Sequence, residues 1–577
     1  MKKKLLPALI VTGLIILVVI IMGITALINK YTPTKKTEDL KEYFNISSDD
    51  EAALIVNNEL SDYKAKIIDK KIYVDYKFVH DSLNSRFYWD ANENVLLYTT
   101  ASDIISAAAD SNSYSVTKQT NDFGYPIVKA TSDSALIALD YVKQYSNITF
   151  KSYDDPARIV ITSKWDEIDS ATVSKSTQVR VKGGIKSPIL KEMKKDDKIT
   201  ILDSGDKWDK VATEDGVIGY IKRKALSESK KTKLTNPDYE EETFTHIKKD
   251  KDICLAWNQV TSQSANSKVP QVISSTKGIN VMSPTWFYLN DNNGNLADIA
   301  SKDYVSYCHS QGIEVWGLFS NFENTDVDAA YVLTHTSTRT TLINQIMSAA
   351  FNYELDGVNI DFENITEAAY GDSYIEFIRE LAIKCHNNGI SLSVDVTVPA
   401  SFNKFFNRSD MANFADYIVI MGYDEHYKGS DAGSVSSIPW VTEGVESTLK
   451  EVPADQIILG MPFYTRIWEL TPKEDDDAVT DTEDQSKYTV ASQVYSMDAA
   501  AAQLATNNAT AALDEESGQN YAEWSASNKL YKVWLEDNTS LENRLKLVDD
   551  NKLAGAAFWK LGFENSSVWD TVIKYLN

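Results

Sequence analysis

Cysteine and histidine are scarce in this sequence, which has 3 cysteines and 6 histidines among 577 residues. Cys254, Cys308 and Cys385 are too few for a chain held together by a disulfide framework. Each lies in or beside an apolar run, so we expect buried free thiols. One disulfide between two of the three cysteines is the alternative. No Cys/His spacing resembles a set of metal ligands, so we expect no metal and no cofactor.

Positive charge is also in deficit. The chain has 58 Lys/Arg against 83 Asp/Glu, a formal net charge of -25. Such an acidic chain repels a phosphate backbone, which excludes the usual nucleic-acid binder. The composition is otherwise that of a globular protein, and the length exceeds what one hydrophobic core can organise, so about two to four domains are expected.

Charge is absent from one long segment near the N-terminus. The letters "MKKK" precede residues 5–28, a run of 24 residues without a charged side chain. Such a run is long enough to cross a bilayer core of about 30 Å. A cleaved secretory signal is the alternative, but its apolar core is usually shorter. We predict an uncleaved single-pass anchor at residues 1–30, with the remaining chain on the outer, cell-wall side of the membrane.

Two small modules are expected between the anchor and the second half of the chain. Residues 37–165 show short strands and helices and loosely resemble the copper-amine-oxidase-like N-terminal module of exported bacterial proteins, without implying copper ligands. Residues 171–228 contain "VRV", "SPIL", "DKITIL", Trp208 and "GYI" between Gly, Asp and Ser turns. This pattern predicts a small β-barrel and resembles bacterial SH3 modules, which commonly bind wall peptides; a passive spacer is the equal alternative. A charged linker is expected at 229–244.

Eight apolar runs of strand length alternate with helical patterns in residues 245–577. Near-continuous apolar runs are typical of parallel strands buried on both faces. Eight of them predict an α/β fold, a (β/α)8 barrel of the TIM type. The seventh and eighth runs, "IILGMPFYTRIW" and "LAGAAFWKLG", are separated by a stretch too long for a loop, which predicts an insertion near 470–530.

The fourth run, "LDGVNIDFE", carries the chemistry. Asn359, Asp361 and Glu363 alternate with three apolar residues, so in a strand all three polar side chains point the same way. Glu363 ends the run, and active sites of such barrels lie at the carboxyl ends of the strands. Carboxylates placed there predict a functional role that carboxylates on the barrel wall would not have.

The spacing resembles the DGxDxDxE signature of glycoside hydrolase family 18, with matches at Asp356, Gly357, Asp361 and Glu363. The resemblance implies that Glu363 protonates the departing oxygen. Asp361 would hold the substrate's own 2-acetamido group, whose oxygen attacks the anomeric carbon. It implies a structural role for Asp356 and Gly357.

Asn359 departs from the signature, which usually has a third acid at this position. An amide cannot share a proton with a neighbouring carboxyl, so we expect Asp361 to titrate alone.

Further positions agree with this family. "IVIMGYDEH" resembles its sixth-strand Met-x-Tyr-Asp, which places Met421 at the site, makes Tyr423 a donor to the acetamido carbonyl and Asp424 a sugar contact. Trp559 on the eighth strand would form the floor of the cleavage subsite. Tyr464, Arg466 and Trp468 are weaker candidates for the binding rim. Trp257, Trp286 and Trp316 are expected in the barrel core.

The expected substrate is an N-acetylglucosamine-containing polysaccharide. The third run, "GLFSNFEN", lacks the Ser-x-Gly-Gly of many family chitinases, and the chain most resembles the bacterial cell-wall and spore-cortex glucosaminidase branch. We therefore expect cleavage of peptidoglycan after N-acetylglucosamine. A chitinase and a catalytically silent carbohydrate-binding protein are the alternatives.

Overall fold

The computed structural model describes residues 5–363, 365, 370–473 and 484–576. The chain divides into two compact units. Unit 1 holds residues 1–89, 107–114 and 121–241, and unit 2 holds residues 90–106, 115–120 and 242–577. Each unit has its own core.

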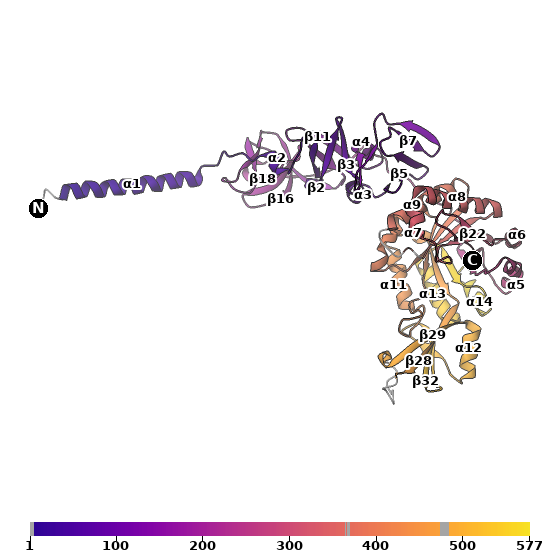
Figure 1. Cartoon of the computed structure of the whole chain (residues 1–577). Helices are drawn as coiled ribbons and strands as arrows, with labels where there is room; N and C mark the ends of the chain where they lie inside the picture. The colour runs from indigo at the N-terminus through magenta and orange to yellow at the C-terminus, as the bar shows by residue number, and fades with distance from the viewer. Residues whose placement is uncertain (1–4, 364, 366–369, 474–483, 577) are drawn as a thin grey trace. The chain divides into compact units, whose positions relative to one another are not determined.

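Unit 2 is built around a closed ring of eight parallel strands (Figure 1). Seven neighbouring pairs run from the first strand to the last, and the last strand pairs in parallel with the first, which closes the ring. The expected eight-stranded barrel is therefore confirmed, and every expected run contains one of its strands. These strands are β20 (Ile253–Asn258), β21 (Val281–Leu289), β23 (Glu314–Ser320), β24 (Gly357–Asp361), β25 (Ser391–Thr397), β26 (Tyr417–Met421), β27 (Ile457–Pro462) and β33 (Gly555–Trp559).

Helices surround the ring, and their buried side chains pack against the outward-facing side chains of the strands to form the hydrophobic core. The largest, α8 (Thr336–Tyr353) and α9 (Gly371–His386), flank strand β24 in the sequence. The others are α5 (Val269–Val272), α6 (Lys302–Ser310), α7 (Ala329–Thr334), α10 (Arg408–Phe414), α11 (Ile438–Thr448), α13 (Asn538–Asn551) and α14 (Val568–Val572). A short strand, β22 (Leu296–Asp298), pairs antiparallel with β21. Cys254, Cys308 and Cys385 are free and buried in this core, as expected.

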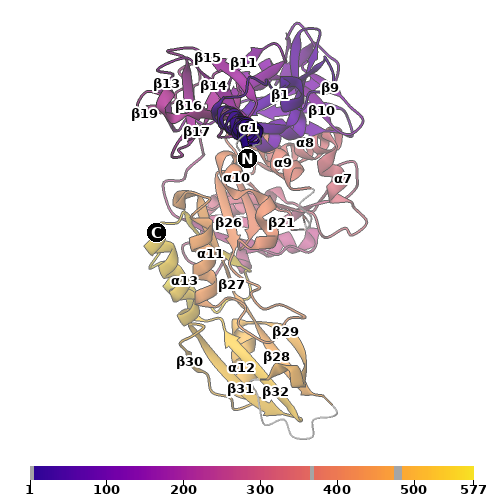
Figure 2. The ribbon, with the colours of Figure 1, turned by 90° about the vertical axis from the view of Figure 1, so that its left-hand side faces the viewer.

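The insertion forms a separate five-stranded antiparallel sheet with one helix (Figure 2). Its elements are β28 (Tyr464–Pro472), β29 (Tyr488–Ser496), α12 (Met497–Thr506), β30 (Ala512–Asp514), β31 (Gln519–Ala526) and β32 (Lys529–Leu535). The seventh apolar run is thus two strands. Barrel strand β27 ends at Pro462 and the insertion sheet begins at Tyr464, earlier than the expected boundary near 470.

Unit 1 begins with helix α1 (Leu5–Tyr31), which is long and apolar enough to cross a membrane over Pro7–Tyr31, with a mean hydropathy of 2.9. A signal sequence has the same length and composition. Short helix α2 (Leu40–Tyr43) follows. A seven-stranded sheet then has the order β11-β12-β1-β2-β3-β10-β9. Its elements are β1 (Glu51–Val56), β2 (Glu59–Ile68), β3 (Lys71–Asp75), α3 (Tyr76–Ser82), β9 (Val128–Ala130), β10 (Ala135–Ala138), α4 (Leu139–Gln144), β11 (Thr149–Tyr153) and β12 (Arg158–Thr162).

A second seven-stranded sheet of unit 1 covers the region where an SH3-like barrel was expected. Its neighbouring strands pair antiparallel, and Val173, just after β13, forms an isolated antiparallel bridge with Leu226, which lies between β18 and β19. Its strands are β13 (Glu167–Thr172), β14 (Thr177–Arg180), β15 (Ile189–Met193), β16 (Lys198–Asp203), β17 (Trp208–Thr213), β18 (Ile218–Lys222) and β19 (Lys230–Lys233). Strand β19 pairs with β13, so the expected linker at 229–244 is part of the sheet over these four residues.

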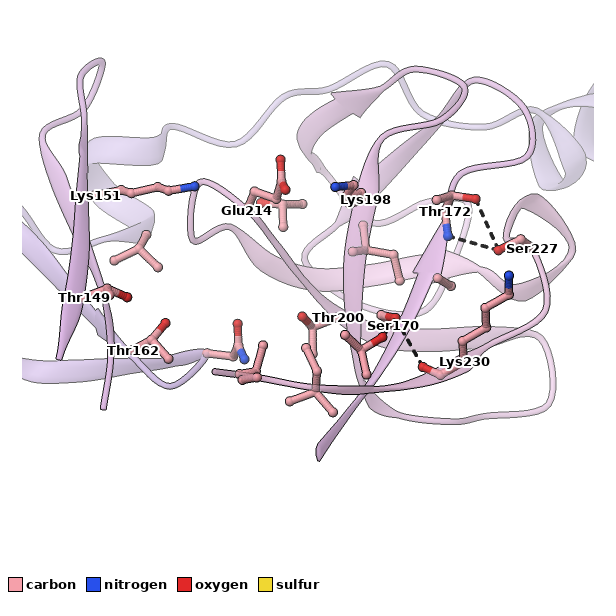
Figure 3. A pocket seen from close by; sticks show the side chains of 18 of the residues that line it. Thr149, Lys151, Thr162, Ser170, Thr172, Lys198, Thr200, Glu214, Ser227 and Lys230 are labelled. Carbon is pink, nitrogen blue, oxygen red and sulfur yellow. Dashed lines mark hydrogen bonds between the residues drawn. The ribbon is translucent and has the colours of Figure 1, made fainter. Parts of the chain in front are cut away.

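A cavity of about 710 Å³ lies within unit 1 and is lined by strands of both seven-stranded sheets (Figure 3). Hydroxyl side chains and three lysines, Lys151, Lys198 and Lys230, form much of its wall. At one end the Ser227 hydroxyl accepts a hydrogen bond from the Thr172 backbone N–H at 3.0 Å. The cavity shares no residue with the barrel.

A further five-stranded sheet has the order β4-β5-β6-β7-β8, in which β6 and β7 pair antiparallel. Its first loop contacts the barrel helices inside unit 2: Asp90 accepts hydrogen bonds from the Thr336 backbone N–H at 2.7 Å and from its hydroxyl at 2.6 Å. The Thr99 hydroxyl donates to Glu376 on α9 at 2.7 Å. The strands are β4 (Phe87–Asp90), β5 (Val95–Thr99), β6 (Ile104–Ala108), β7 (Ser113–Val116) and β8 (Gln119–Asp122). Residues 90–106 thus belong with the barrel rather than with the rest of the expected 37–165 module.

Candidate active site

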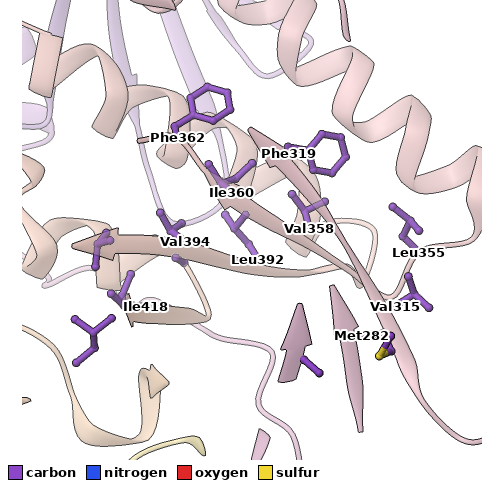
Figure 4. Packing of buried hydrophobic residues seen from close by; sticks show 14 of the residues in the cluster. Met282, Val315, Phe319, Leu355, Val358, Ile360, Phe362, Leu392, Val394 and Ile418 are labelled. Atoms are coloured by element: carbon purple, nitrogen blue, oxygen red, sulfur yellow. The ribbon is translucent and has the colours of Figure 1, made fainter. Parts of the chain in front are cut away.

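Strand β24 separates its apolar and polar side chains onto two faces. Val358, Ile360 and Phe362 are buried in the core between the strands and the helices (Figure 4). Leu392 and Val394 of β25 pack in the same layer. Since successive side chains of a strand point to opposite faces, Asn359 and Asp361 point into the barrel. Glu363 follows directly after the strand at its carboxyl end.

The amino end of β24 is held by the residues expected to be structural. A Cβ on Gly357 would lie 2.5 Å from the Trp316 ring, so only glycine fits there. Asp356 accepts a hydrogen bond from the Val315 backbone N–H at 2.8 Å and contacts His309 at the same distance. Trp316 itself is fully buried, as are Trp257 and Trp286, which confirms these three tryptophans as core residues.

Asn359 lies at the centre of a hydrogen-bond network inside the barrel. Its carbonyl oxygen accepts from Trp257 Nε1 at 2.9 Å and from Ser283 Oγ at 2.8 Å. An indole N–H can only donate, so the amide orientation is fixed. Asn359 Nδ2 therefore faces β25 and donates to Asp395 Oδ1 at 2.7 Å.

Asp395 is a buried carboxylate that the sequence interpretation missed. Strands β24 and β25 pair in parallel with Asn359 opposite Ser393 and Ile360 opposite Val394, so Asp361 and Asp395 occupy the next neighbouring positions. Adjacent strands lie about 4.8 Å apart, which brings two inward-facing carboxyls together. A signal was available, because Ser391, Ser393 and Asp395 alternate with apolar residues as the polar residues of β24 do.

Asp361 does not titrate alone, so that expectation is wrong. Burial raises the pKa of Asp361 well above its usual value, and the negative charges of Asp395, Glu363 and Glu323 raise it further. Burial also raises the pKa of Asp395, while the hydrogen bond from Asn359 acts in the opposite direction. Asp361 Oδ1 is buried and has no hydrogen-bond partner among the described residues.

Glu363 lies at the mouth of the barrel with part of its side chain open to solvent. Partial desolvation by the surrounding protein raises the pKa of Glu363, and the charges of Asp424 and Glu323 add to the effect. Glu323, which the sequence interpretation also did not identify, lies just beyond β23. Its carboxylate accepts a hydrogen bond from the Ser320 hydroxyl at 2.6 Å. A carboxyl with a raised pKa stays protonated at higher pH, as a general acid requires.

A chain of aromatic contacts begins at Trp257, whose indole donates to Asn359. Trp257 contacts Trp559 edge-on, with ring centroids 6.1 Å apart, and Tyr423 edge-on at 6.4 Å. Tyr464 lies beyond Tyr423, with centroids 6.3 Å apart. Burial and the charges of Asp361 and Asp395 raise the pKa of Tyr423 well above its usual value, so its hydroxyl remains a donor.

Asp424 connects the barrel mouth to the insertion. Its backbone adopts a left-handed φ of 61°, and its carboxylate accepts a hydrogen bond from the Tyr464 hydroxyl at 2.6 Å. The Arg466 guanidinium lies 3.5 Å from the same oxygen. The expected rim role of Trp468 is wrong: this residue is 1% exposed in the core of the insertion sheet, where its indole donates to the Gly433 carbonyl.

A cavity of about 160 Å³ opens beside Glu363. Asp395 and Met421 line it, together with aromatic side chains from the loop after β25. Phe402 of that loop is 78% exposed. Met421, expected at the site, thus lies next to the candidate acid.

The arrangement brings together an acid, an inner carboxyl pair and aromatic surfaces. Glu363, Asp361, Asn359, Tyr423, Asp424, Tyr464, Met421 and Trp559 all lie at or beneath one end of the barrel, whereas Asp356 and Gly357 lie at the other end of β24. Within the described residues, no group of three or more His, Cys, Asp or Glu side chains is placed to hold a metal ion. The chemistry available is proton transfer and charge stabilisation.

Comparison with known families gives one match within this barrel. Residues 318–564 match the model of glycosyl hydrolases family 18. The family model thus identifies a family 18 domain within residues 318–564 of this barrel. The matched segment contains β24, β25 and β33, so it includes every carboxylate described above and Trp559.

Most of the relatives of the family 18 domain come from Bacillus species. The uncharacterized glycosylase YvbX of Bacillus subtilis is 24% identical over 301 residues, which are 49% of this chain and 81% of the relative. The cortical fragment-lytic enzyme of B. subtilis is 24% identical over 287 residues, 48% of this chain and 63% of that enzyme. A probable di-N-acetylchitobiase 2 of Dictyostelium discoideum is 23% identical over 252 residues, 38% of this chain and 66% of that protein.

Solved structures share the fold of the family 18 domain. The crystal structure of the Bacillus cereus spore cortex-lytic enzyme SleL superposes with a TM-score of 0.50 at 19% identity. The alignment covers 57% of this chain and 76% of that enzyme.

Proposed function

We propose that this protein is a membrane-anchored glycosidase that cleaves peptidoglycan after N-acetylglucosamine with retention of configuration. The family 18 match supports glycosidase activity. The observation that carries the proposal is the placement of Asp361 at the carboxyl end of β24 and of Glu363 two residues beyond it, both with raised pKa values.

Glu363 serves as general acid in this proposal. Its raised pKa keeps it protonated near neutral pH, and its position at the barrel mouth suits protonation of a bridging oxygen. The substrate's acetamido oxygen then attacks the anomeric carbon, and the resulting oxazolinium ion carries positive charge. Asp361, one pleat deeper, orients the acetamido N–H and stabilises that charge. Glu363, now ionised, activates the water that opens the ring.

Tyr423 and Trp559 complete the cleavage subsite. The Tyr423 hydroxyl donates to the acetamido carbonyl and the Trp559 ring packs against the apolar face of the sugar. Asp424 contacts a sugar hydroxyl, with its carboxylate held by Tyr464 and Arg466.

Peptidoglycan is proposed as substrate from three features. The third strand lacks Ser-x-Gly-Gly, helix α1 suits a membrane anchor, and relatives include enzymes named for spore-cortex fragments. Substrate assistance needs a 2-acetamido group, and the lactyl ether of muramic acid would need additional room in the cleavage subsite.

Product analysis tests this proposal. Purified peptidoglycan is incubated with wild type and with Glu363→Gln, and the reduced products are identified by mass spectrometry. We expect new reducing ends on N-acetylglucosamine with wild type and a loss of at least about 100-fold in rate with the variant. New reducing ends on muramic acid would contradict the proposed specificity.

Two other functions are tested in the same assay. Faster turnover of chitooligosaccharides than of peptidoglycan would favour a chitinase. Equal signals from wild type and Glu363→Gln, together with retained binding to the polymer, would favour a silent carbohydrate-binding protein. The presence of Glu363 argues against the silent function.

A further inference from the structure

The third acid missing from strand β24 has a counterpart on the neighbouring strand. Asn359 occupies the position where the family signature has a carboxyl, and Asn359 Nδ2 donates to Asp395 Oδ1 at 2.7 Å. Asp395 is 4% exposed and lies at the register position next to Asp361. The acid is therefore displaced by one strand rather than lost.

We propose that Asp395 supplies the second inner carboxyl of this site from strand β25 and shares one proton with Asp361. Asp395 is a positioning residue: it holds that proton while the Asp361 carboxylate contacts the acetamido group. This inference rests on the proposed function for its catalytic meaning, whereas the shared proton is a property of the resting protein.

The surroundings of the pair favour a single shared charge. Two carboxyls in one buried site do not both ionise near neutral pH, because like charges repel in a poorly solvated interior. Glu363 and Glu323 add negative charge. Tyr374 on α9 and Tyr423, two residues beyond the end of β26, also interact with the pair: burial and the charges of Asp361 and Asp395 raise the pKa of both phenols, so they stay neutral.

The hydrogen bond from Asn359 decides where the charge rests. Burial and the charge of Glu363 disfavour ionisation of both carboxyls, but Asp395 accepts the hydrogen bond from Asn359, which stabilises its ionised form. In the resting protein the charge is thus on Asp395 and the proton on Asp361. When the oxazolinium charge develops beside Asp361, the O–H bond of Asp361 breaks and an O–H bond forms on Asp395. The net charge of the pair is unchanged, so no proton is exchanged with solvent.

The pH dependence of kcat/KM distinguishes this role from a purely structural one. In Asp395→Asn the first proton must leave Asp361 itself. We expect the acidic limb of the profile of kcat/KM against pH to move to higher pH by about one unit. At pH values below this limb, kcat/KM should be about tenfold lower than in wild type. The double variant Asn359→Asp/Asp395→Asn moves the acid back to β24 and keeps a hydrogen bond between the two side chains. We expect it to return the limb to within a few tenths of a unit of wild type.

The matched control is Glu376→Gln, which neutralises another fully buried carboxylate, on α9, outside the site. We expect it to lower the melting temperature without moving the acidic limb. An unmoved limb in folded Asp395→Asn would overturn the proposal. A shifted limb that the double variant does not restore would overturn it as well, because a local structural effect would then explain the shift.

Infrared titration of protonated carboxyl groups provides a readout that is independent of activity. Wild type should lose the carbonyl bands of the pair in two separate steps, and Asp361→Asn and Asp395→Asn should each leave one step. If wild type hydrolyses no glycoside, the proposed function fails. The number of titration steps in the infrared spectrum still shows whether Asp361 and Asp395 share a proton. If wild type is active and Asp395→Asn leaves the titration of Asp361 unchanged, only the present inference fails.

Discussion

At the residue scale, the site depends on carboxyl groups held close enough to raise one another's pKa. Glu363 is flanked by Asp424 and Glu323, whose charges disfavour its ionised form. The same carboxyl is only partly desolvated, so its pKa responds to these neighbours and to solvent. Glu363 thus remains a proton donor because burial and two neighbouring carboxylates raise its pKa, and no cation among the described residues contributes to this change in pKa.

Replacement of Asp424 should change the alkaline limb of the pH profile. Glu363 must be protonated to act as an acid, and activity is lost as pH rises through its pKa. Asp424→Asn removes a negative charge that raises this pKa, so the alkaline limb should move to lower pH by about half to one unit. The measurement is kcat/KM against pH on a soluble aryl glycoside of N-acetylglucosamine.

Asp424→Glu serves as the matched control because it keeps the charge. We expect its alkaline limb to stay near that of wild type even if its turnover falls through altered contacts with Tyr464 and Arg466. Identical limbs in wild type and Asp424→Asn would show that Asp424 does not set the proton affinity of Glu363.

The sequence predicted the alternation of polar and apolar side chains along β24, because polar side chains at every second position are costly unless they have a use. Asp395 was missed because it lies outside the recognisable signature, although Ser393 and Asp395 follow the same period. No sequence pattern indicates that Asn359 donates to Asp395, since this depends on the register between two strands that are separated by helix α9.

At the element scale, helix α13 is joined to the end of β32 by a buried ion pair. Arg544 of α13 and Glu536 are 1% and 2% exposed, and their side chains are in direct contact. Arg544 Nη1 also donates to the Ser436 carbonyl at 2.6 Å, and Ser540 donates to Glu536 at 2.8 Å. This cluster ties the last strand of the insertion sheet to a barrel helix.

Breaking this pair should destabilise unit 2. Arg544→Met leaves Glu536 buried without its cation, at an expected cost of about 3–5 kcal/mol in the free energy of unfolding. Chemical denaturation followed by loss of glycosidase activity measures the change. Arg544→Met/Glu536→Gln should recover part of the loss, because it removes the unpaired charge and keeps an acceptor for Ser540. A double variant as unstable as the single one would assign the cost to lost packing of Arg544.

Element boundaries were predictable where one strand occupies one apolar run. The run "IILGMPFYTRIW" was interpreted as a single strand, but it spans β27 and β28 in two different sheets. Both strands are buried, so the hydrophobic pattern continues through Phe463 and does not reveal the change of sheet. Trp468 was misplaced for the same reason, because a buried tryptophan of the insertion core and a rim tryptophan look alike in sequence.

At the scale of the whole molecule, the proposed anchor function of helix α1 predicts where the protein is found in the cell. Deletion of residues 1–31 should move the protein from the membrane fraction to the soluble fraction while kcat on a soluble substrate stays within about twofold, because the barrel has its own core. Fractionation with carbonate extraction measures the first effect and initial rates the second.

Full-length Glu363→Gln is the control for this experiment, since it should remain in the membrane fraction although it is inactive. Recovery of the full-length protein in the carbonate supernatant would contradict the anchor and favour a cleaved signal sequence.

Closure of the barrel by its first and last strands has a consequence for biosynthesis. Residues 253–256 pair with residues 555–558, so the ring has an open edge until nearly the whole chain has been synthesised. Trp559 also arrives with this final strand. A chain that is still being translated therefore has no closed barrel. If the protein is exported and hydrolyses wall polymer as proposed, that hydrolysis can begin only after the last strand has been translocated.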